Sequence, residues 1–232
     1  MKRLLLPVFV FIAFVAIPQG RENFTREVSD FRKIKASNGV KVNLIKGKSN
    51  QIVIHSHGIE QEDIITEVNG KTLKLSIDAW SQLREKNKRW EVEIDVRVQK
   101  LDEITSVTGA RVVGDFKLSG RDILITGNTG GELYLELEMD EVIVNASTGA
   151  ILKLKGQTDY LEVTSNMGSE VEASWLSANY VLAKAGMGGT LEVYARNEIT
   201  SSASLGGVIE VTGNPPRTHT RKNLGGVVNG VR

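Results

Sequence analysis

Thr148-Gly149-Ala150-Ile151-Leu152-Lys153-Leu154 is one instance of a pattern that occurs seven times before the C-terminus. Each instance has a glycine, then a small residue, and an aliphatic residue three positions after the glycine. The glycines lie 18 to 21 residues apart, at Gly109, Gly130, Gly149, Gly168, Gly188, Gly206 and Gly225. The aliphatic residues are Val112, Leu133, Leu152, Val171, Leu191, Ile209 and Val228. A period of about 19 residues is too short for a helix pair and fits one coil of a β-solenoid.

Each repeat contains two strand patterns joined at the glycine. Leu152 and Leu154 share one face of a strand and Lys153 points the opposite way. A second apolar position lies seven residues before five of the glycines, at Ile123, Val142, Leu161, Val181 and Ile199. Glycine at the corner supplies positive φ without steric strain. Stacked coils would share one apolar interior, so the sequence predicts an all-β, right-handed parallel β-helix, with the hand taken from the crossover rule.

The first twenty residues have the composition of an export signal. Lys2 and Arg3 precede an apolar run from Leu4 to Ile17, and Ala16 and Gly20 are candidate small residues at the cleavage site. The run is shorter than the roughly 20 apolar residues of a membrane span. We therefore expect residues 1–20 to be removed, leaving an exported protein of the periplasm, the cell surface or the medium with no membrane insertion; the alternative is an uncleaved anchor helix.

Composition excludes several other classes of site and partner. The chain has no cysteine, which excludes disulfides, cysteine nucleophiles and cysteine-bound metals. Without Lys2 and Arg3 it has 27 basic and 28 acidic side chains, a formal charge of −1. This balance gives no electrostatic footprint for nucleic acid. A homo-oligomer is compatible with the sequence.

Residues 21–100 differ from the repeats of 101–232. Asn69-Gly70 between alternating segments predicts a β-hairpin. Residues 91–98 alternate as a strand, while residues 80–89 are polar and basic and read as a loop. We expect an antiparallel β region that caps the first coil, within one structural domain of residues 21–232, because an exposed apolar coil invites aggregation.

Several motifs in this region resemble a known family. They are Phe31-x-x-Ile34, Asn38-Gly39-Val40-x-Val42, Gly47 and Gly70-x-x-Leu73-x-Leu75. With the glycine repeats, they are similar to the auto-transporter adhesin head domain, also called the GIN-domain or DUF2807 family. The resemblance covers about residues 30–230. It implies an exported bacterial protein with a β-helix similar to pectate-lyase-like proteins, and it assigns no functional residue.

Two groups of side chains are candidate chemical sites. His55 and His57 share a strand face near Glu60, Glu62 and Asp63, and either bind a metal or simply face solvent. Glu132, Glu136 and Glu138 lie with Tyr134 on one strand face. Paired carboxylates can hydrolyse glycosides, but outward charges are the default on a solenoid strand.

Stacking of the repeats suggests two further candidate sites. The outward position four residues after each glycine places Glu172, Glu192 and Glu210 on neighbouring coils. They form either a surface Ca²⁺ site or a solvated ladder partly offset by Lys184 and Arg196. The aromatic residues that could stack on a polysaccharide are Tyr160, Trp175, Tyr180 and Tyr194, with core packing as the alternative.

Three asparagines, Asn128, Asn166 and Asn223, each precede a corner glycine by two residues. We assign them a structural role, in which they bond to corner backbone and tolerate the left-handed conformation. The residues contain no convincing catalytic acid, nucleophile or complete metal shell, and no cofactor is implied. The sequence thus predicts a non-catalytic envelope protein, an adhesin-like module that binds glycan or protein. The alternatives are a polysaccharide lyase or glycoside hydrolase on the same scaffold, or a purely structural envelope component.

Overall fold

The computed structural model describes residues 22–48, 50–78 and 89–231. The expected export signal, residues 1–20, and all but Arg89 of the expected loop at residues 80–89 lie outside these ranges. Sixteen strands of the described chain form one continuous hydrogen-bonded sheet. The strands are β1 (Glu22–Glu27), β2 (Lys33–Ala36), β3 (Lys41–Lys46), β4 (Gln51–His57), β5 (Ile64–Asn69), β6 (Thr72–Ile77), β7 (Glu91–Val98), β8 (Glu103–Val107), β9 (Arg111–Asn128), β10 (Glu132–Ala146), β11 (Ile151–Ser165), β12 (Glu170–Ala185), β13 (Thr190–Ala203), β14 (Val208–Thr212), β15 (Arg217–Lys222) and β16 (Val227–Asn229), with one 3₁₀ helix, η1 (Gln61–Asp63).

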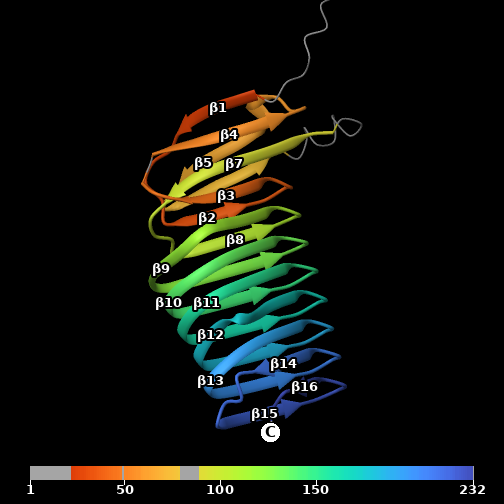
Figure 1. The fold of residues 1–232 in the computed structure, drawn as a ribbon. Coiled ribbons are helices and arrows are strands. Elements are labelled where there is room, and N and C mark those ends of the chain that lie inside the picture. The colour runs from red at the N-terminus through yellow and green to blue at the C-terminus, as the bar shows by residue number, and fades with distance from the viewer. Residues whose placement is uncertain (1–21, 49, 79–88, 232) are drawn as a thin grey trace, which may run out of the picture.

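The coils stack into the predicted parallel β-helix (Figure 1). Each coil begins after a tight turn, runs along a first wall, bends, and returns along a second wall to the next turn. In β10 the first wall buries alternate residues from Leu133 to Met139, and the second wall buries Val142, Val144 and Ala146. Asp140 and Glu141 face outward in succession between them. Figure 1 shows the turns along one edge and the bends along the opposite edge; these are called the turn edge and the bend edge.

The turns all have the same backbone conformation. In every repeat the glycine and the residue before it both have positive φ, as Thr148 (53°) and Gly149 (69°) do. The N–H of Ala150 donates to the carbonyl of Ser147 at 3.2 Å, which closes a type I′ turn. The Gly149 N–H donates to the Met167 carbonyl of the next turn at 3.2 Å, so the turns are also bonded to one another. The predicted glycine corner is confirmed.

The role expected for the corner asparagines was wrong in one respect. The left-handed residue is the one directly before the glycine, for example Thr129 and Met167, and not Asn128, Asn166 or Asn223 two positions before it. The asparagines are instead the first residues of the turns. The Asn166 carbonyl accepts the turn hydrogen bond from the N–H of Ser169 at 3.1 Å.

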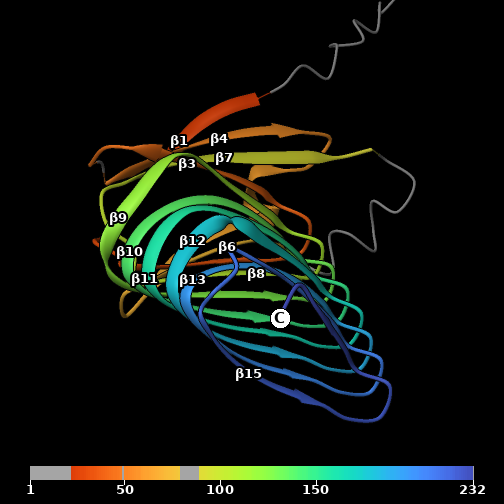
Figure 2. The same cartoon turned by 60° about the horizontal axis from the view of Figure 1, so that its bottom comes forward.

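The predicted interior column is also confirmed. The aliphatic residues three positions after each glycine are direct neighbours on adjacent strands, from Val112 to Val228. Each is at most 3% exposed. The second column pairs in the same way from Ile123 to Ile199. Figure 2, which turns the molecule toward a view along the stack, shows the coils superimposed around this interior.

The N-terminal region contains both the expected antiparallel cap and an additional coil. β1 pairs with β4, β4 with β7, and β5 with β6, all antiparallel. The predicted hairpin joins β5 to β6, with Gly70 at φ 63° as its first loop residue. β2 and β3, however, pair in parallel with β6 and β7 on one side and with β8 and β9 on the other. Asn38 and Gly39, which join β2 to β3, both have positive φ, as the paired residues of the repeat turns do. The coil of β2 and β3 therefore lies between two sets of strands that come later in the sequence.

Candidate functional site: a groove along the bend edge

A bulge in β12 shifts the stacking of the first wall close to the bend edge. Ala173 pairs with Val193, but the next paired residue of β12 is Ser177, opposite Tyr194. The three residues between have no partner in β13. Within the bulge Leu176 is fully buried, whereas Trp175 is 81% exposed, the most exposed of the large apolar side chains described. Bulges commonly re-aim a side chain in this way.

A polar hollow of about 430 Å³ lies at the bends beside this bulge. Hydrogen bonds between neighbouring coils fix its carboxylates and amides. Gln157 Nε2 donates to Glu138 Oε1 at 2.9 Å, and Asn179 Nδ2 donates to Asp159 Oδ1 at 2.7 Å. Its lining is formed by Ser119, Gly120, Glu138, Met139, Asp140, Gln157, Thr158, Asp159, Ser177, Asn179 and Arg196. The hollow therefore presents pre-oriented hydrogen-bonding groups, and an ionised carboxylate can accept further bonds.

The four aromatic candidates are not among the lining residues, but they lie close to them along the chain or across strand pairs. Tyr160 and Tyr180 are direct neighbours on adjacent strands, and each follows a lining residue, Asp159 or Asn179, in the chain. On the first-wall side, Tyr194 lies opposite Ser177, and Trp175 precedes Ser177 by two residues. Tyr180 is 40% exposed. The structure thus gathers the aromatic residues around the bends of β11, β12 and β13, where polar groups lie between them.

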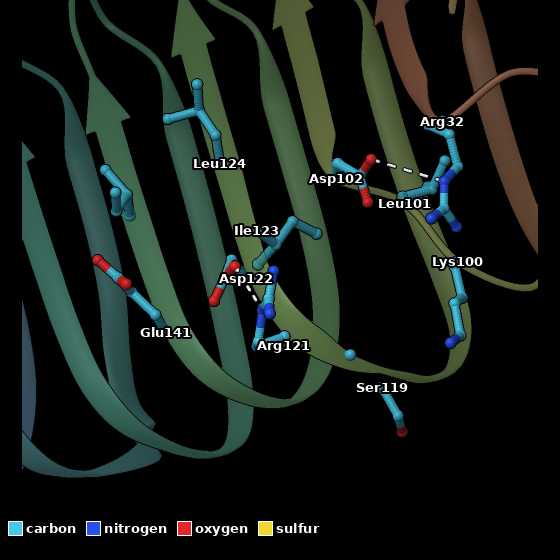
Figure 3. A pocket seen from close by; sticks show the side chains of 12 residues that line it. Arg32, Lys100, Leu101, Asp102, Ser119, Arg121, Asp122, Ile123, Leu124 and Glu141 are labelled. Atoms are coloured by element: carbon cyan, nitrogen blue, oxygen red, sulfur yellow. Dashed lines mark hydrogen bonds and ion pairs between the residues drawn. The ribbon is translucent and has the colours of Figure 1, made fainter.

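A second hollow, of about 690 Å³, continues along the same edge toward the N-terminus (Figure 3). Ser119 and Gly120 line both hollows. Its charged groups have both signs, with an Arg32–Asp102 ion pair at 3.6 Å and an Arg121–Asp122 ion pair at 3.0 Å. Together the hollows form a bend-edge groove from the segment before β8 to β13. Five strand spacings of roughly 4.8 Å give it a length of about 24 Å.

Tyr160 carries a neutral phenol in this environment. Partial burial raises its pKa from the ordinary 10.0, and the negative charges of Glu162 and Glu141 raise it further. The hydroxyl group consequently remains an available hydrogen-bond donor near the groove well above neutral pH.

The carboxylates of β10 are engaged in ion pairs between coils. Glu132 faces Arg111 at 3.5 Å, Glu136 faces Lys155 at 3.0 Å, and Glu138 faces Lys117 at 3.6 Å. Tyr134 donates to Glu132 at 3.1 Å and lies under the Arg111 guanidinium. Burial, then its bond to Glu132, raises the pKa of Tyr134. This arrangement matches a charged outer face.

The predicted acidic column is confirmed as a stack, because Glu172, Glu192 and Glu210 are direct neighbours on β12, β13 and β14. The cation that pairs with it differs from the expectation. Lys153 contacts Glu172 at 2.6 Å, while Lys184 pairs with Glu162 at 2.9 Å on the second wall. Arg196, the other expected cation, lines the polar hollow beside the β12 bulge. Asn229 also donates to Glu210 at 2.6 Å.

Within residues 22–48, 50–78 and 89–231, no three His, Asp or Glu side chains form a group that could hold a metal ion. This holds for the stacked Glu172, Glu192 and Glu210 as well. His55 contacts Asn23 at 2.7 Å and Asp95 at 3.4 Å, whereas His57 lines a separate hollow beside Trp90. The geometry therefore does not support either metal hypothesis.

Sequence reasoning missed the polar residues of the bends. No motif in the sequence singles out the lining residues Asp140, Gln157, Asp159 and Asn179. A usable signal was present, because successive outward residues such as Asp140 and Glu141 interrupt the apolar alternation. Stacking these interruptions in the period of the repeat would have placed them on one edge.

Comparison with known families identifies the class of this protein. The chain belongs to the family described as "Putative auto-transporter adhesin, head GIN domain" (DUF2807), whose model matches residues 30–215. This confirms the resemblance found in the motifs from Phe31 onward. Membership in an adhesin family indicates a surface or exported protein.

Solved structures show the same fold. A putative adhesin from Bacteroides fragilis NCTC 9343 has a TM-score of 0.74 and 20% identity, over 90% of this chain and 96% of that one. A putative adhesin from Parabacteroides merdae ATCC 43184 has a TM-score of 0.68 and 16% identity, over 90% and 95%. A putative lipid binding protein from Parabacteroides distasonis ATCC 8503 has a TM-score of 0.63 and 16% identity, over 91% and 97%.

None of these descriptions names an enzyme. No curated protein matches the chain. In the part of the chain that the structure describes, no helix is long and apolar enough to cross a membrane.

Proposed function

We propose that this chain is an exported, non-catalytic adhesin-like module that binds a glycan chain along the bend-edge groove. The observation that carries the proposal is the bulge of β12, which places Trp175 in solvent beside the hollow of Gln157, Asp159 and Asn179. Aromatic faces stack on the apolar faces of sugar rings, while carboxylates and amides bond to sugar hydroxyls.

The charge of the polar hollow beside the β12 bulge favours an uncharged glycan. Its lining has three carboxylates, Glu138, Asp140 and Asp159, against the single cation Arg196. An anionic polysaccharide would meet repulsion at these groups. The length of the groove, about 24 Å from the strand spacing, suits an extended chain better than a single sugar. Protein ligands fit less well, because protein interfaces are typically depleted of acidic residues at their core.

Binding and catalysis are tested together on the purified protein. A panel of bacterial, plant and host polysaccharides is screened for binding, and the best ligand is titrated by calorimetry. Trp175→Ala is expected to weaken binding about tenfold or more, whereas Trp175→Phe retains most of it. Tyr134→Ala, an outward aromatic outside the groove, serves as the control and leaves binding unchanged.

The oligosaccharides are then recovered and weighed by mass spectrometry. Intact ligand supports a binding module, while shortened or unsaturated products contradict the non-catalytic assignment. Equal affinity of the wild type and Trp175→Ala would remove the glycan site from the bend edge. Export is tested separately by expressing the full chain and sequencing the N-terminus of the secreted product, which is expected to begin near residue 21.

A further inference from the structure

The residue before each turn glycine changes character along the turn edge. In the earlier turns it is Asn38, Thr108, Thr129 or Thr148. In the last four it is a large apolar residue, and these four form what we call the apolar ridge: Met167, Met187, Leu205 and Leu224. Their side chains are 50%, 51%, 51% and 78% exposed, in that order. The ridge extends onto Val227, which is 40% exposed on the neighbouring first wall.

The backbone at these positions favours different residues. All four ridge residues have φ between 47° and 51°. The first central position of a type I′ turn prefers asparagine, aspartate or glycine, and a bulky side chain there is strained. The apolar side chains therefore oppose the local conformational preference while also exposing apolar surface. A conflict of this kind at successive coils indicates that the side chains themselves have a role.

Hydrogen bonds between turns hold Met167, Met187 and Leu205 in a fixed row. The Gly149 N–H donates to the Met167 carbonyl and the Gly168 N–H to the Met187 carbonyl, both at 3.2 Å. The Gly188 N–H donates to the Leu205 carbonyl at 3.1 Å. The side chains consequently project one strand spacing apart, at roughly 4.8 Å, on a rigid support. Such a row loses little conformational entropy of the backbone on binding.

We propose that the apolar ridge is a dimer contact, in which two copies of this chain pack turn edge to turn edge about a two-fold axis parallel to the solenoid. Both ridges then have the same spacing, so each ridge residue meets its own counterpart. In this arrangement the first-wall flank of one copy faces the second-wall flank of the other. The exposed carboxylate of Glu170 thereby faces the amide of Asn166 of the second copy, which can donate to it.

Small uncharged residues border the ridge on the second wall, which suits a protein interface. They are Asn166, Gly186, Ser204 and Asn223, while the charges of Lys184, Arg221 and Lys222 lie farther from the turns along this wall. Depletion of charge around an apolar centre is typical of interfaces between copies. Since four or five side chains bury less than the roughly 800 Å² per partner of a standard interface, we expect a weak, concentration-dependent dimer. The turn edge and the bend edge are opposite one another, so the bend-edge groove of each copy would remain open in the dimer.

The test combines association with monomer stability. Sedimentation velocity over a range of concentrations is expected to show a dimer for the wild type. The double variant Met187→Asn, Leu205→Asn is expected to raise the dissociation constant of the dimer at least tenfold. Because asparagine suits the left-handed position, the same pair of substitutions should raise the melting temperature of the dilute monomer by about 2–4 °C or more. Thr148→Asn, the matched control outside the ridge, should raise it as well and leave the dimer unchanged.

Orientation is tested by cross-linking, for which the absence of native cysteine is convenient. Leu205→Cys alone is expected to form a disulfide dimer, since each Leu205 faces its counterpart. A wild type that stays monomeric at every concentration overturns the proposal, as does a dimer that survives both asparagine substitutions. Recruitment of the monomer to anionic lipid vesicles through Met187 and Leu205, without a dimer, would assign the ridge to a membrane surface and also overturn it.

Discussion

The turn edge and the bend edge belong to the same coils, yet they differ in regularity. Every turn has the same pair of left-handed residues, and the turns from Asn38-Gly39 to Leu205-Gly206 are bonded in succession. The bends and the strands that lead into them differ from coil to coil, with extra residues in β9, β12 and β13, and they line the hollows. A regular edge fixes the stacking, so an opposite edge can vary without loss of the fold.

The largest expected effect is at the turn edge, for Gly131→Ala. The added Cβ would lie 2.1 Å from the Ser106 carbonyl oxygen, which is backbone and cannot move alone. We expect a loss of about 2–3 kcal/mol of unfolding free energy, measured by urea denaturation. Ala150 occupies the same place one turn later, so Ala150→Gly should cost under about 1 kcal/mol. Equal losses for the two would contradict the steric cause.

Gly168→Ala tests backbone conformation without a clash. The added Cβ has nothing within 4 Å, but φ is +68°. The left-handed conformation should cost about 1–2 kcal/mol. Gly120→Ala, at the bend edge, meets only the flexible end of Met139, with Sδ at 3.3 Å, and is expected to change stability by less than about 0.5 kcal/mol. A bend glycine as sensitive as the turn glycine would break the distinction between the edges.

Two adjacent residues of the β12 bulge sharpen the comparison. Trp175→Ala should change the unfolding free energy by less than about 0.5 kcal/mol, because the side chain is 81% exposed. Leu176→Ala should cost about 2–5 kcal/mol, because Leu176 is fully buried. Thermal or urea unfolding of both variants checks this. A large loss for Trp175→Ala would mean that the tryptophan supports the fold and is not reserved for ligand.

The smallest effect concerns alkaline pH at the bend edge. The pKa of Tyr160 is raised in the folded protein, first by burial and then by Glu162 and Glu141. Above pH 10.0 the unfolded chain therefore loses this proton before the folded chain does, so stability falls as pH rises through that window. Tyr160→Phe should reduce the fall relative to the wild type, measured as the melting temperature at about pH 9, 10 and 11. An unchanged slope would contradict the assigned environment.

The glycine period and the apolar columns were sufficient to predict the solenoid, since their spacing specifies which residues stack. The extra coil of β2 and β3 was not recognised, because Gly39 and Gly109 are 70 positions apart in the numbering and the intervening strands return to cover it. The four aromatic candidates stay a prediction as a ligand site. Their arrangement around the bends was not predictable, because the bulge of β12 shifts Trp175 and Tyr194 out of the simple repeat.

The sequence by itself determined the coil, the corner and the interior of this protein, since each depends on a local pattern of glycine and aliphatic residues that repeats with a fixed period. Only the tertiary structure decided which polar residues share the bend-edge groove and how far the apolar residues before the turn glycines are exposed. Both depend on side chains from different coils being placed side by side by parallel pairing. That pairing occurs at separations of about 19 residues or more, which no local pattern of polar residues encodes.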